Sequence, residues 1–280
     1  MVQGDHGAEV FGDPNCVTGG KVDFFIAGVQ KGGTTALAGV LGRHPAIRMA
    51  NVKEVHFFDD VRQDWGNPDY EPYHRWFRPS KPETLLSGEA TPIYLYQSAT
   101  LDRICHYNPA AKFIVCLRHP AFRAHSHWRM ETLRGSETWE FRRAISPEGR
   151  TRVQDGDRAS RIFSYVERGL YAGQIRHLFE RFPRGQIHIL RTDHLWSDPA
   201  TSLADIYAFL RVTPTEQQGP AKYVVPHDSR TVGGLSVADR RELEDAFRKD
   251  IRETQAIAGL DLSDWLDPQY EEPMPSASGG

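Results

Sequence analysis

Residues 30–35 read QKGGTT, so a lysine, two glycines and two threonine hydroxyls come together in one short run. An apolar run rich in β-branched and aromatic residues, 22–27, precedes it, and helix-forming residues follow it. This pattern predicts a strand, a glycine turn and a helix. Backbone N–H groups and the positive end of the helix dipole converge in such a turn, so we expect it to bind a phosphate group. An ordinary turn with a threonine helix cap is the alternative.

A second basic position follows another strand of the buried type. Residues 112–117, KFIVCL, form a continuous apolar run, and Arg118 comes directly after it. Pro120 suits the first turn of a helix that we expect to continue to Leu133, which places Ser126 about two turns into that helix. Ligands of open α/β sheets bind at the carboxyl ends of the strands. Arg118 is therefore a candidate for binding a second anionic group.

The glycine turn differs from the P-loop of nucleoside triphosphate enzymes, G-x-x-x-x-G-K-[ST]. Lys31 precedes the glycine pair, and no serine or threonine directly follows the lysine to supply a metal-binding hydroxyl. The second strand ends in Arg118 rather than in an aspartate that would hold magnesium. These features predict a nucleotide with two separate phosphate sites and no metal. A magnesium-dependent P-loop kinase and a nucleotide-binding module without catalysis are the alternatives.

Three motifs in this order resemble a known family. GVQKGGTTAL, KEVHFFD and LRHPAFRAHSHW are similar to the sulfotransferases that use 3′-phosphoadenosine 5′-phosphosulfate (PAPS), most closely the heparan sulfate sulfotransferase branch. The resemblance covers roughly residues 22–266 and suggests a bacterial-type soluble member. It implies that the glycine turn wraps the 5′-phosphosulfate, with Lys31 on the bridging oxygen, and that Arg118 and Ser126 hold the 3′-phosphate. The donor-binding residues expected from it are Gln30, Lys31, Gly32, Gly33, Thr34, Thr35, Arg118, Ser126 and Arg230, the last in a loop that closes over the nucleotide.

The resemblance also implies a catalytic base. Glu54 matches the position of the family's base, and His56 matches a histidine placed near the acceptor. A carboxylate partly buried beside Phe57 and Phe58 is expected to have a raised pKa, as a general base requires. From the residues alone, Glu54 is more often a solvated charge at a helix start. Catalysis is thus assigned to Glu54, Lys31 and His56 as an expectation.

An aromatic, proline-broken segment follows, at residues 65–77. Such a segment suits the wall of a pocket for an organic acceptor, although its residues equally well pack a loop onto the core. The residues expected to contact the acceptor are Phe57, Trp65, Tyr73, Trp76 and Thr91. Arg123 is expected to form a surface ion pair, and contact with the 3′-phosphate is the alternative.

Two departures from the heparan branch point to a smaller acceptor. The chain has Glu89-Ala90-Thr91-Pro92 where that branch has Glu-Lys-Thr-Pro, and it lacks the branch's paired cysteines between residues 213 and 234. We therefore expect in-line transfer of a sulfuryl group to a hydroxyl of a small molecule, which is a natural product, a lipid or a short saccharide. Transfer to an oxygen or nitrogen of a polysaccharide is the alternative.

Composition sets broad limits. A formal net charge of −3 over 280 residues argues against nucleic acid as the main partner, and no apolar run approaches the length of a membrane helix. We see no signal peptide and expect a cytoplasmic protein. The three cysteines show no metal-ligand spacing, so we expect no metal. No motif indicates an oligomeric state.

Strands that alternate with helices, each strand apolar throughout, predict a three-layer α/β fold of the P-loop type with a central parallel sheet. We expect a loose arm at residues 1–20, one domain at 21–268 and a disordered tail at 269–280. A mobile loop is expected at 146–157. A single long amphipathic helix is expected at 160–182.

Overall fold

The computed structural model describes residues 20–78, 84–215 and 234–273. Its centre is a five-stranded sheet in the order β2-β3-β1-β4-β5, in which every neighbouring pair is parallel. Continuous apolar runs form two of the central strands, at residues 24–28 and 112–117, because both of their faces are covered. The strands are β1 (Phe24–Gly28), β2 (Ile47–Met49), β3 (Leu86–Ala90), β4 (Lys112–Leu117) and β5 (Ile187–Arg191).

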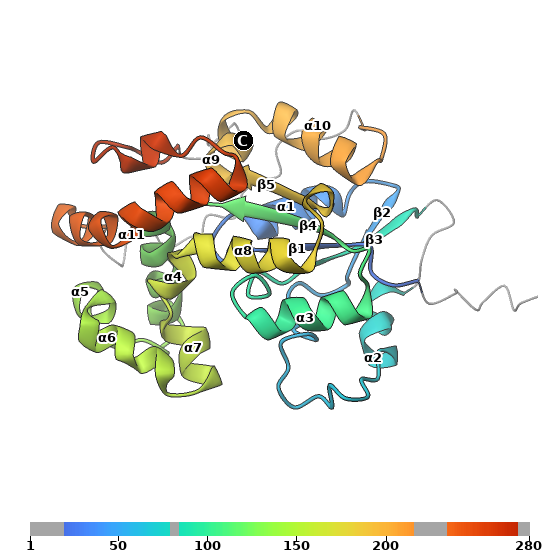
Figure 1. Ribbon diagram of the computed structural model, residues 1–280, viewed down its shortest axis with the longest axis horizontal. Coiled ribbons are helices and arrows are strands. Elements are labelled where there is room, and N and C mark those ends of the chain that lie inside the picture. The colour runs from blue at the N-terminus through green and yellow to red at the C-terminus, as the bar shows by residue number, and fades with distance from the viewer. Residues whose placement is uncertain (1–19, 79–83, 216–233, 274–280) are drawn as a thin grey trace, which may run out of the picture.

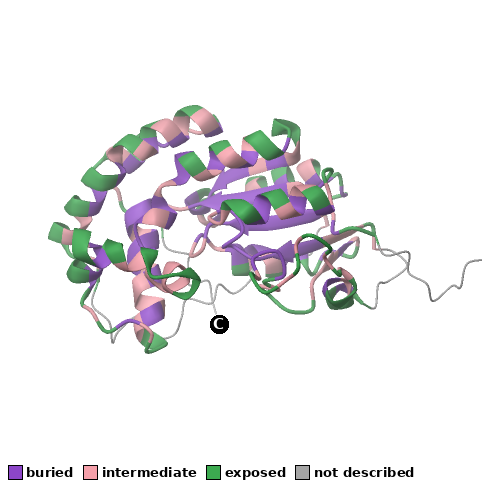
Figure 2. Ribbon diagram, turned by 60° about the horizontal axis from the view of Figure 1, so that its bottom comes forward, coloured by how far each residue is buried: buried purple, intermediate pink, exposed green. Residues whose placement is uncertain are grey.

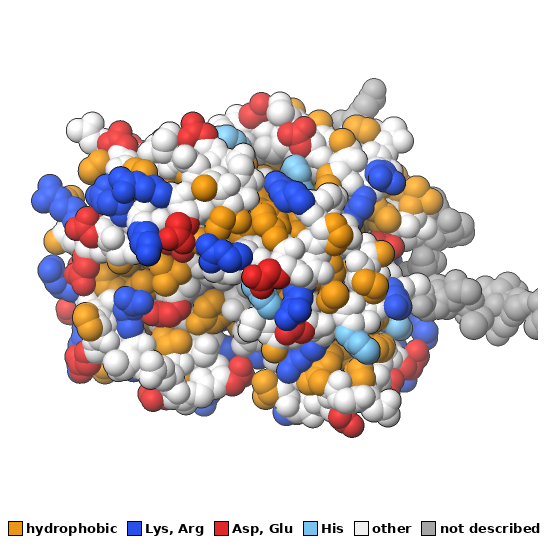
Figure 3. Space-filling view, in the orientation of Figure 1, with side chains coloured by type: hydrophobic (Ala, Val, Ile, Leu, Met, Phe, Trp, Pro, Cys, Tyr) orange, Lys and Arg blue, Asp and Glu red, His pale blue; other side chains and the backbone are white. Residues whose placement is uncertain are grey.

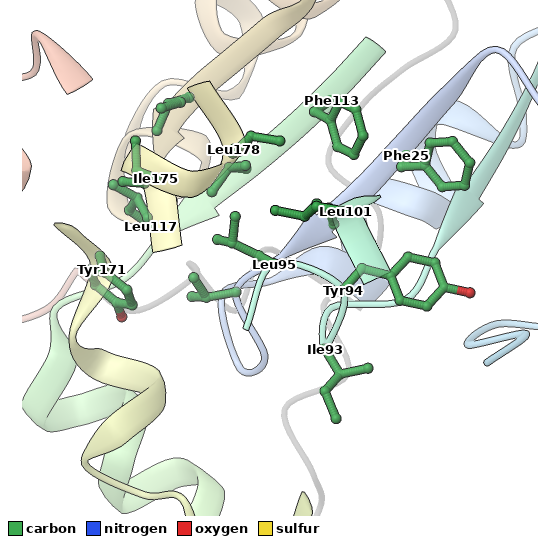
Figure 4. Packing of buried hydrophobic residues seen from close by; sticks show 14 of the residues in the cluster. Phe25, Ile93, Tyr94, Leu95, Leu101, Phe113, Leu117, Tyr171, Ile175 and Leu178 are labelled. Atoms are coloured by element: carbon green, nitrogen blue, oxygen red, sulfur yellow. The ribbon is translucent and has the colours of Figure 1, made fainter. Parts of the chain in front are cut away.

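Helices cover both faces of this sheet (Figure 1). On one face, α1 (Thr34–Leu41) and α10 (Pro199–Leu210) share a hydrophobic cluster with Phe24 and Ile26 of β1. On the other, α3 (Ser98–Tyr107) and α8 (Tyr171–Arg181) pack on the alternate strand residues Phe25 and Phe113, as Figure 4 shows. The helices bury the side facing the sheet and expose the other (Figure 2). The expected three-layer fold is confirmed.

The remaining helices lie around this three-layer core (Figure 1). They are α4 (Pro120–Leu133), α9 (Thr192–Ser197) and α11 (Val237–Ala258), with the short helices α2 (Glu71–His74), α5 (Phe141–Ile145), α6 (Pro147–Thr151) and α7 (Asp157–Phe163). Single 3₁₀ turns are η1 (Arg75–Phe77), η2 (Arg152–Gln154), η3 (Glu167–Gly169), η4 (Arg184–Gln186) and η5 (Ser263–Leu266).

The single long helix expected at 160–182 is wrong. Helix α7 ends at Phe163, and α8 begins at Tyr171. Gly169 packs so tightly that a Cβ atom there would lie 2.7 Å from the Phe247 ring. Asp250 of α11 accepts a hydrogen bond from the Tyr171 N–H at 2.6 Å, which caps a new helix at that point. Contacts with α11 therefore override the local helical pattern.

The mobile loop expected at 146–157 is also wrong for most of its length. Ser146 caps α6 by accepting from the Gly149 N–H at 3.3 Å. Arg152 then lies over the rings of Trp139 and Phe163, at 4.2 and 3.5 Å from their centroids. These contacts give the segment fixed helical structure.

The expected tail begins too early. Tyr270 stacks on His119 with ring centroids 5.1 Å apart, and Glu272 forms an ion pair with Arg118. Residues 269–273 therefore pack on the domain. The expected arm at 1–20, except Gly20, and the rest of the expected tail lie outside the described residues.

Candidate active site

The glycine turn lies between β1 and α1, as predicted. Gly32 approaches β4 so closely that a Cβ atom would lie 2.4 Å from the Cys116 carbonyl oxygen. Gly33 has a φ of 80°, in the left-handed region, and forms the N-cap of α1 without a side-chain hydrogen bond. Thr192 Oγ1 donates to the Gly32 carbonyl oxygen at 2.9 Å and so ties the turn to the end of β5. Because no side chain caps α1, its first N–H groups are placed to receive an anion.

Lys31 occupies the turn with a φ of 70°. Its Nζ atom lies 3.9 Å from Met130 Sδ of α4. Burial and then the neighbouring positive charges of Arg118, Arg134 and Lys53 lower the pKa of Lys31 to about 8, although Glu54 opposes the shift. The amine thus lies among other cations, in surroundings that favour a bound anion.

Arg118 follows β4 and is adjacent to the turn. Its Nη1 donates to the Lys31 carbonyl oxygen at 3.0 Å. Its Nε and Nη2 donate to the two carboxylate oxygens of Glu272, at 2.7 and 2.5 Å. Ser126 is half-buried on α4, as expected from the helix prediction. The structure therefore brings Lys31 and Arg118 together at the carboxyl ends of β1 and β4.

Glu54 and His56 lie in the segment after β2, and both have a positive φ, of 59° and 56°. Such values are unusual for residues with a Cβ atom and often occur at functional sites. Glu54 forms an ion pair with Lys53, and its Oε2 lies 3.5 Å from His56 Nε2. The Glu54 N–H donates to the Ala90 carbonyl oxygen at 3.1 Å, which holds this segment against the end of β3.

The expected raised pKa of Glu54 is wrong. Burial acts to raise it, but the hydrogen bond with His56 and the charge and hydrogen bond of Lys53 outweigh burial and lower the pKa of Glu54 to about 2. Hydrogen bonds with Asp59 and Glu54 raise the pKa of His56 to about 9. At neutral pH the site therefore holds a carboxylate beside an imidazolium.

Asp59 and Arg161 extend this site, and the sequence did not single them out for it. Asp59 is buried, and its Oδ2 accepts a hydrogen bond from His56 Nδ1 at 2.7 Å. Arg161 forms an ion pair with the same carboxylate and donates from Nη2 to the Asp59 carbonyl oxygen at 2.6 Å. The KEVHFFD motif contains Asp59, but Arg161 lies 102 residues further along the chain.

Gln30 has a partner that sequence reasoning also missed. Its Oε1 accepts a hydrogen bond from Arg168 Nη1 at 2.5 Å. Arg168 is 3% exposed and lies in the break between α7 and α8. A buried guanidinium is thus tied directly to the residue before Lys31.

A family model described as the Sulfotransferase domain matches residues 21–225. The chain belongs to the sulfotransferase family. A crystal structure of a sulfotransferase from Alicyclobacillus acidocaldarius is similar, with a TM-score of 0.74 and 28% identity over 88% of this chain and 99% of that one.

Similar sequences carry names from the heparan branch. Human heparan sulfate glucosamine 3-O-sulfotransferase 6 is 32% identical over 66% of this chain and 51% of its own length. Mouse heparan sulfate glucosamine 3-O-sulfotransferase 5 is 28% identical over 69% of this chain and 54% of its own. The chain therefore spans about half the length of these curated relatives.

Two residues expected to contact the acceptor have other partners in this sulfotransferase. Tyr73 is 0% exposed, and Thr91 is also buried. The Tyr73 hydroxyl donates to Glu89 Oε2 at 2.5 Å, and the Thr91 and Tyr94 hydroxyls donate to Glu89 Oε1 at 2.6 and 2.7 Å. These hydroxyls satisfy a buried carboxyl, so Tyr73 and Thr91 are part of the core.

The other expected acceptor residues differ in exposure. Phe57 is buried and stacks on Tyr73 with centroids 4.8 Å apart. Trp65 is half-buried, and the guanidinium carbon of Arg103 lies 4.3 Å from the centroid of its ring. Trp76 is 43% exposed. The aromatic segment therefore mainly packs on the core, and Trp65 and Trp76 remain the candidates for contact with an acceptor.

The expected surface ion pair of Arg123 is wrong. Its side chain is 0% exposed and donates to the Tyr165 carbonyl oxygen from the interior. Of the other residues expected to bind the donor, Thr34 is buried and Thr35 is exposed, both at the start of α1. Arg230 lies outside the described residues.

Charged side chains of both signs are mixed over the face shown in Figure 3. Within residues 20–78, 84–215 and 234–273, no three histidine, cysteine or acidic side chains are placed to bind a metal ion together. In the same part of the chain, no helix has both the length and the apolar character needed to cross a bilayer.

Proposed function

We propose that this chain transfers a sulfuryl group from PAPS to a hydroxyl of a small-molecule acceptor. One observation carries the proposal, namely that the glycine turn brings Lys31 beside Arg118 and near Glu54, so that each of these charges shifts the pKa of the lysine. Two cations for a doubly phosphorylated nucleotide and one carboxylate for an acceptor hydroxyl are what sulfuryl transfer needs.

The residues present fit PAPS. Gly32 leaves no room for a side chain against β4, and the uncapped start of α1 and the Lys31 amine suit the 5′-phosphosulfate. Arg118 and Ser126 would hold the 3′-phosphate. When bound, PAPS supplies an activated sulfuryl group with a phosphate leaving group. Lys31 would stabilise the charge that grows on the oxygen between phosphorus and sulfur.

Glu54 would take the proton of the acceptor hydroxyl at a carboxylate oxygen. With a pKa of about 2, the carboxylate is ionised throughout the neutral range but binds a proton weakly. An acceptor that displaces Lys53 from Glu54 would remove one of the contacts that lower this pKa and would strengthen the base. His56, held by Asp59, would keep the carboxylate oriented.

The acceptor class rests on what replaces the lysine of the heparan branch. Position 90 is a buried alanine at the end of β3, so this position offers no charge to an acidic glycan. A small hydroxyl compound that packs on Trp65 and Trp76 fits this surface. The names of the relatives favour a second candidate, transfer to a glycan. Both candidates use the same donor and the same base.

Nucleotide binding tests the donor. Adenosine 3′,5′-bisphosphate in EDTA should raise the melting temperature of the protein, and ATP with magnesium should not. Stabilisation by ATP with magnesium alone would favour the kinase alternative. Mass spectrometry of a metabolite extract incubated with the protein and PAPS should then show products heavier by one sulfo group. Products from heparan oligosaccharides but from no small metabolite would favour the glycan candidate.

A further inference from the structure

The break between α7 and α8 creates a binding site for a guanidinium. Helix α7 ends at Phe163, so its last carbonyl groups have no partner within the helix. Arg168 turns back to this end and donates from Nη2 to the Arg161 carbonyl oxygen at 2.8 Å and from Nε to Ser164 Oγ at 2.8 Å. A cation at a helix C-terminus is also favoured by the helix dipole. The end of α7 thereby fixes the orientation of the Arg168 side chain.

This orientation directs the remaining Nη1 of Arg168 at the glycine turn, where it donates a hydrogen bond to Gln30 Oε1 at 2.5 Å. All three acceptors of Arg168 are uncharged oxygens, so its charge is not cancelled by them. Burial, followed by the neighbouring charge of Arg123, lowers the pKa of Arg168 to about 10, and the side chain is still charged at neutral pH. A buried positive charge therefore lies behind the loop that we assign to the phosphosulfate.

The same helix reaches the acceptor side through Arg161. Its Nε donates to Asp157 Oδ2 at 2.6 Å, within α7, and its other nitrogens hold the carboxylate and the carbonyl group of Asp59. Asp59 in turn holds His56, which faces Glu54. Helix α7 thus carries Arg161, the partner of Asp59, and its C-terminal end orients Arg168, the partner of Gln30.

We propose that Arg168 and Arg161 are positioning residues that fix the glycine turn and the Glu54 carboxylate relative to one another. The proposal rests on the proposed sulfuryl transfer and adds two residues to that site. Reacting groups must be held to a fraction of an ångström, and misplacement by about 1 Å costs on the order of 100-fold in rate. The run from Gln30 through Arg168, Arg161, Asp59 and His56 to Glu54 supplies that constraint through direct contacts.

A double-mutant cycle tests the donor arm, by which we mean the contact between Arg168 and Gln30. Gln30→Leu and Arg168→Lys should each raise the KM for PAPS about tenfold with little change in kcat, and the double variant should be no worse than either single variant. Effects that multiply in the double variant, or an unchanged KM in Gln30→Leu, would overturn this arm. If Arg168→Lys does not fold, Ser164→Ala takes its place, because it removes the hydroxyl that orients Arg168.

Steady-state kinetics and an NMR titration test the acceptor arm, by which we mean the contacts from Arg161 through Asp59 to His56. Arg161→Gln removes a positive charge beside Asp59, so the pKa of His56 should rise further, while kcat falls and the KM for PAPS stays within twofold. The titration of the His56 imidazole by NMR reports this shift without turnover. A fall in kcat with an unchanged His56 titration would overturn the acceptor arm. Arg161→Lys keeps the charge and should recover part of the activity.

Arg150→Gln is the matched control. Arg150 pairs with Glu167 at 2.7 Å in the same region, so the variant makes the same charge change without a contact to Asp59 or Gln30. It should leave both KM and the His56 titration unchanged. A parent protein that binds no adenosine 3′,5′-bisphosphate would overturn the proposed function and the positioning role together. Normal binding with parental kinetics in all the variants would overturn the positioning role alone.

Discussion

Both carboxylate oxygens of Glu272 accept hydrogen bonds from Arg118, through Nε at 2.7 Å and Nη2 at 2.5 Å. A phosphate presents two oxygens to a guanidinium in the same way. Tyr270 holds this end of the chain in place, because it stacks on His119 and donates to Asp193 Oδ2 at 3.0 Å. Glu272 thus occupies the edge of Arg118 that a 3′-phosphate would use.

Glu272→Gln should therefore bind adenosine 3′,5′-bisphosphate more tightly than the parent. The gain should be roughly threefold to tenfold, or about 1 kcal/mol, because the pair is partly exposed to solvent. Isothermal titration calorimetry measures it. Glu271→Gln, which changes the same charge one residue away, should leave the affinity unchanged. Weaker or equal binding by Glu272→Gln would show that the carboxylate does not compete with the nucleotide.

Arg118→Ala should weaken binding of the same nucleotide by roughly 1.5–3 kcal/mol, the range for a hydrogen bond to a charged group. The loss should be larger when it is measured in the Glu272→Gln background, where no internal carboxylate has to be displaced. Calorimetry of the four proteins checks both statements. An unchanged affinity would place the 3′-phosphate away from Arg118.

The layers of the fold could be predicted because they depend on local patterns. The apolar runs that form β1 and β4 are buried on both faces, and Lys31 and Arg118 could be predicted as site residues because they come within three residues of the ends of these strands. The partners of the site residues could not be found in this way. Arg168 lies 138 residues from Gln30, and Glu272 lies 154 residues from Arg118. A single sequence contains no local signal for contacts of that range.

The two expectations that failed most clearly did so for a related reason. The helical pattern at 160–182 is real, but Asp250 of another helix caps a new helix at Tyr171. The pKa of Glu54 was expected to follow from burial beside aromatic rings, whereas Lys53 and His56 determine its direction. In both cases a specific tertiary contact outweighs the local tendency.

Tyr73→Phe should destabilise the fold rather than impair acceptor binding. The variant removes one of the three hydroxyls that satisfy the buried Glu89 carboxyl, at a cost of roughly 1–3 kcal/mol. Urea unfolding measures the loss, and the KM for any acceptor should be unchanged. Tyr70→Phe is the control from the same aromatic cluster, because the Tyr70 hydroxyl has no hydrogen-bond partner among the described residues. If Tyr73→Phe raised the KM for the acceptor and kept the stability of the parent, Tyr73 would be assigned to the acceptor site.

Glu54→Gln should retain nucleotide binding and lose at least 100-fold in kcat, because the amide cannot take the acceptor proton. The carboxylate is already ionised at neutral pH in the free protein, so kcat/KM for the acceptor should show no acidic limb from Glu54 between pH 5 and 7. Steady-state kinetics with the acceptor found by mass spectrometry, together with calorimetry, separates the two effects. Turnover equal to that of the parent would remove Glu54 from the mechanism.

Nucleotide affinity should fall as the pH rises above about 8. The pKa of Lys31 in the free protein is about 8, lowered by burial and by neighbouring cations. A bound phosphate favours the charged amine and so raises this pKa in the complex, which means that binding takes up a proton at higher pH. The phosphate groups themselves are fully ionised there, since their second pKa is about 6. Affinity should therefore be constant from pH 7 to 7.5 and then decline by up to tenfold per pH unit.

Calorimetry across this range measures the decline, and Lys31→Arg, which stays charged, should abolish it. His56→Gln should retain the decline, because His56 titrates near pH 9 on the acceptor side of the site. A decline that persists in Lys31→Arg but disappears in His56→Gln would show that His56, and not Lys31, is the titrating group. It would contradict the proposed contact between Lys31 and the phosphosulfate.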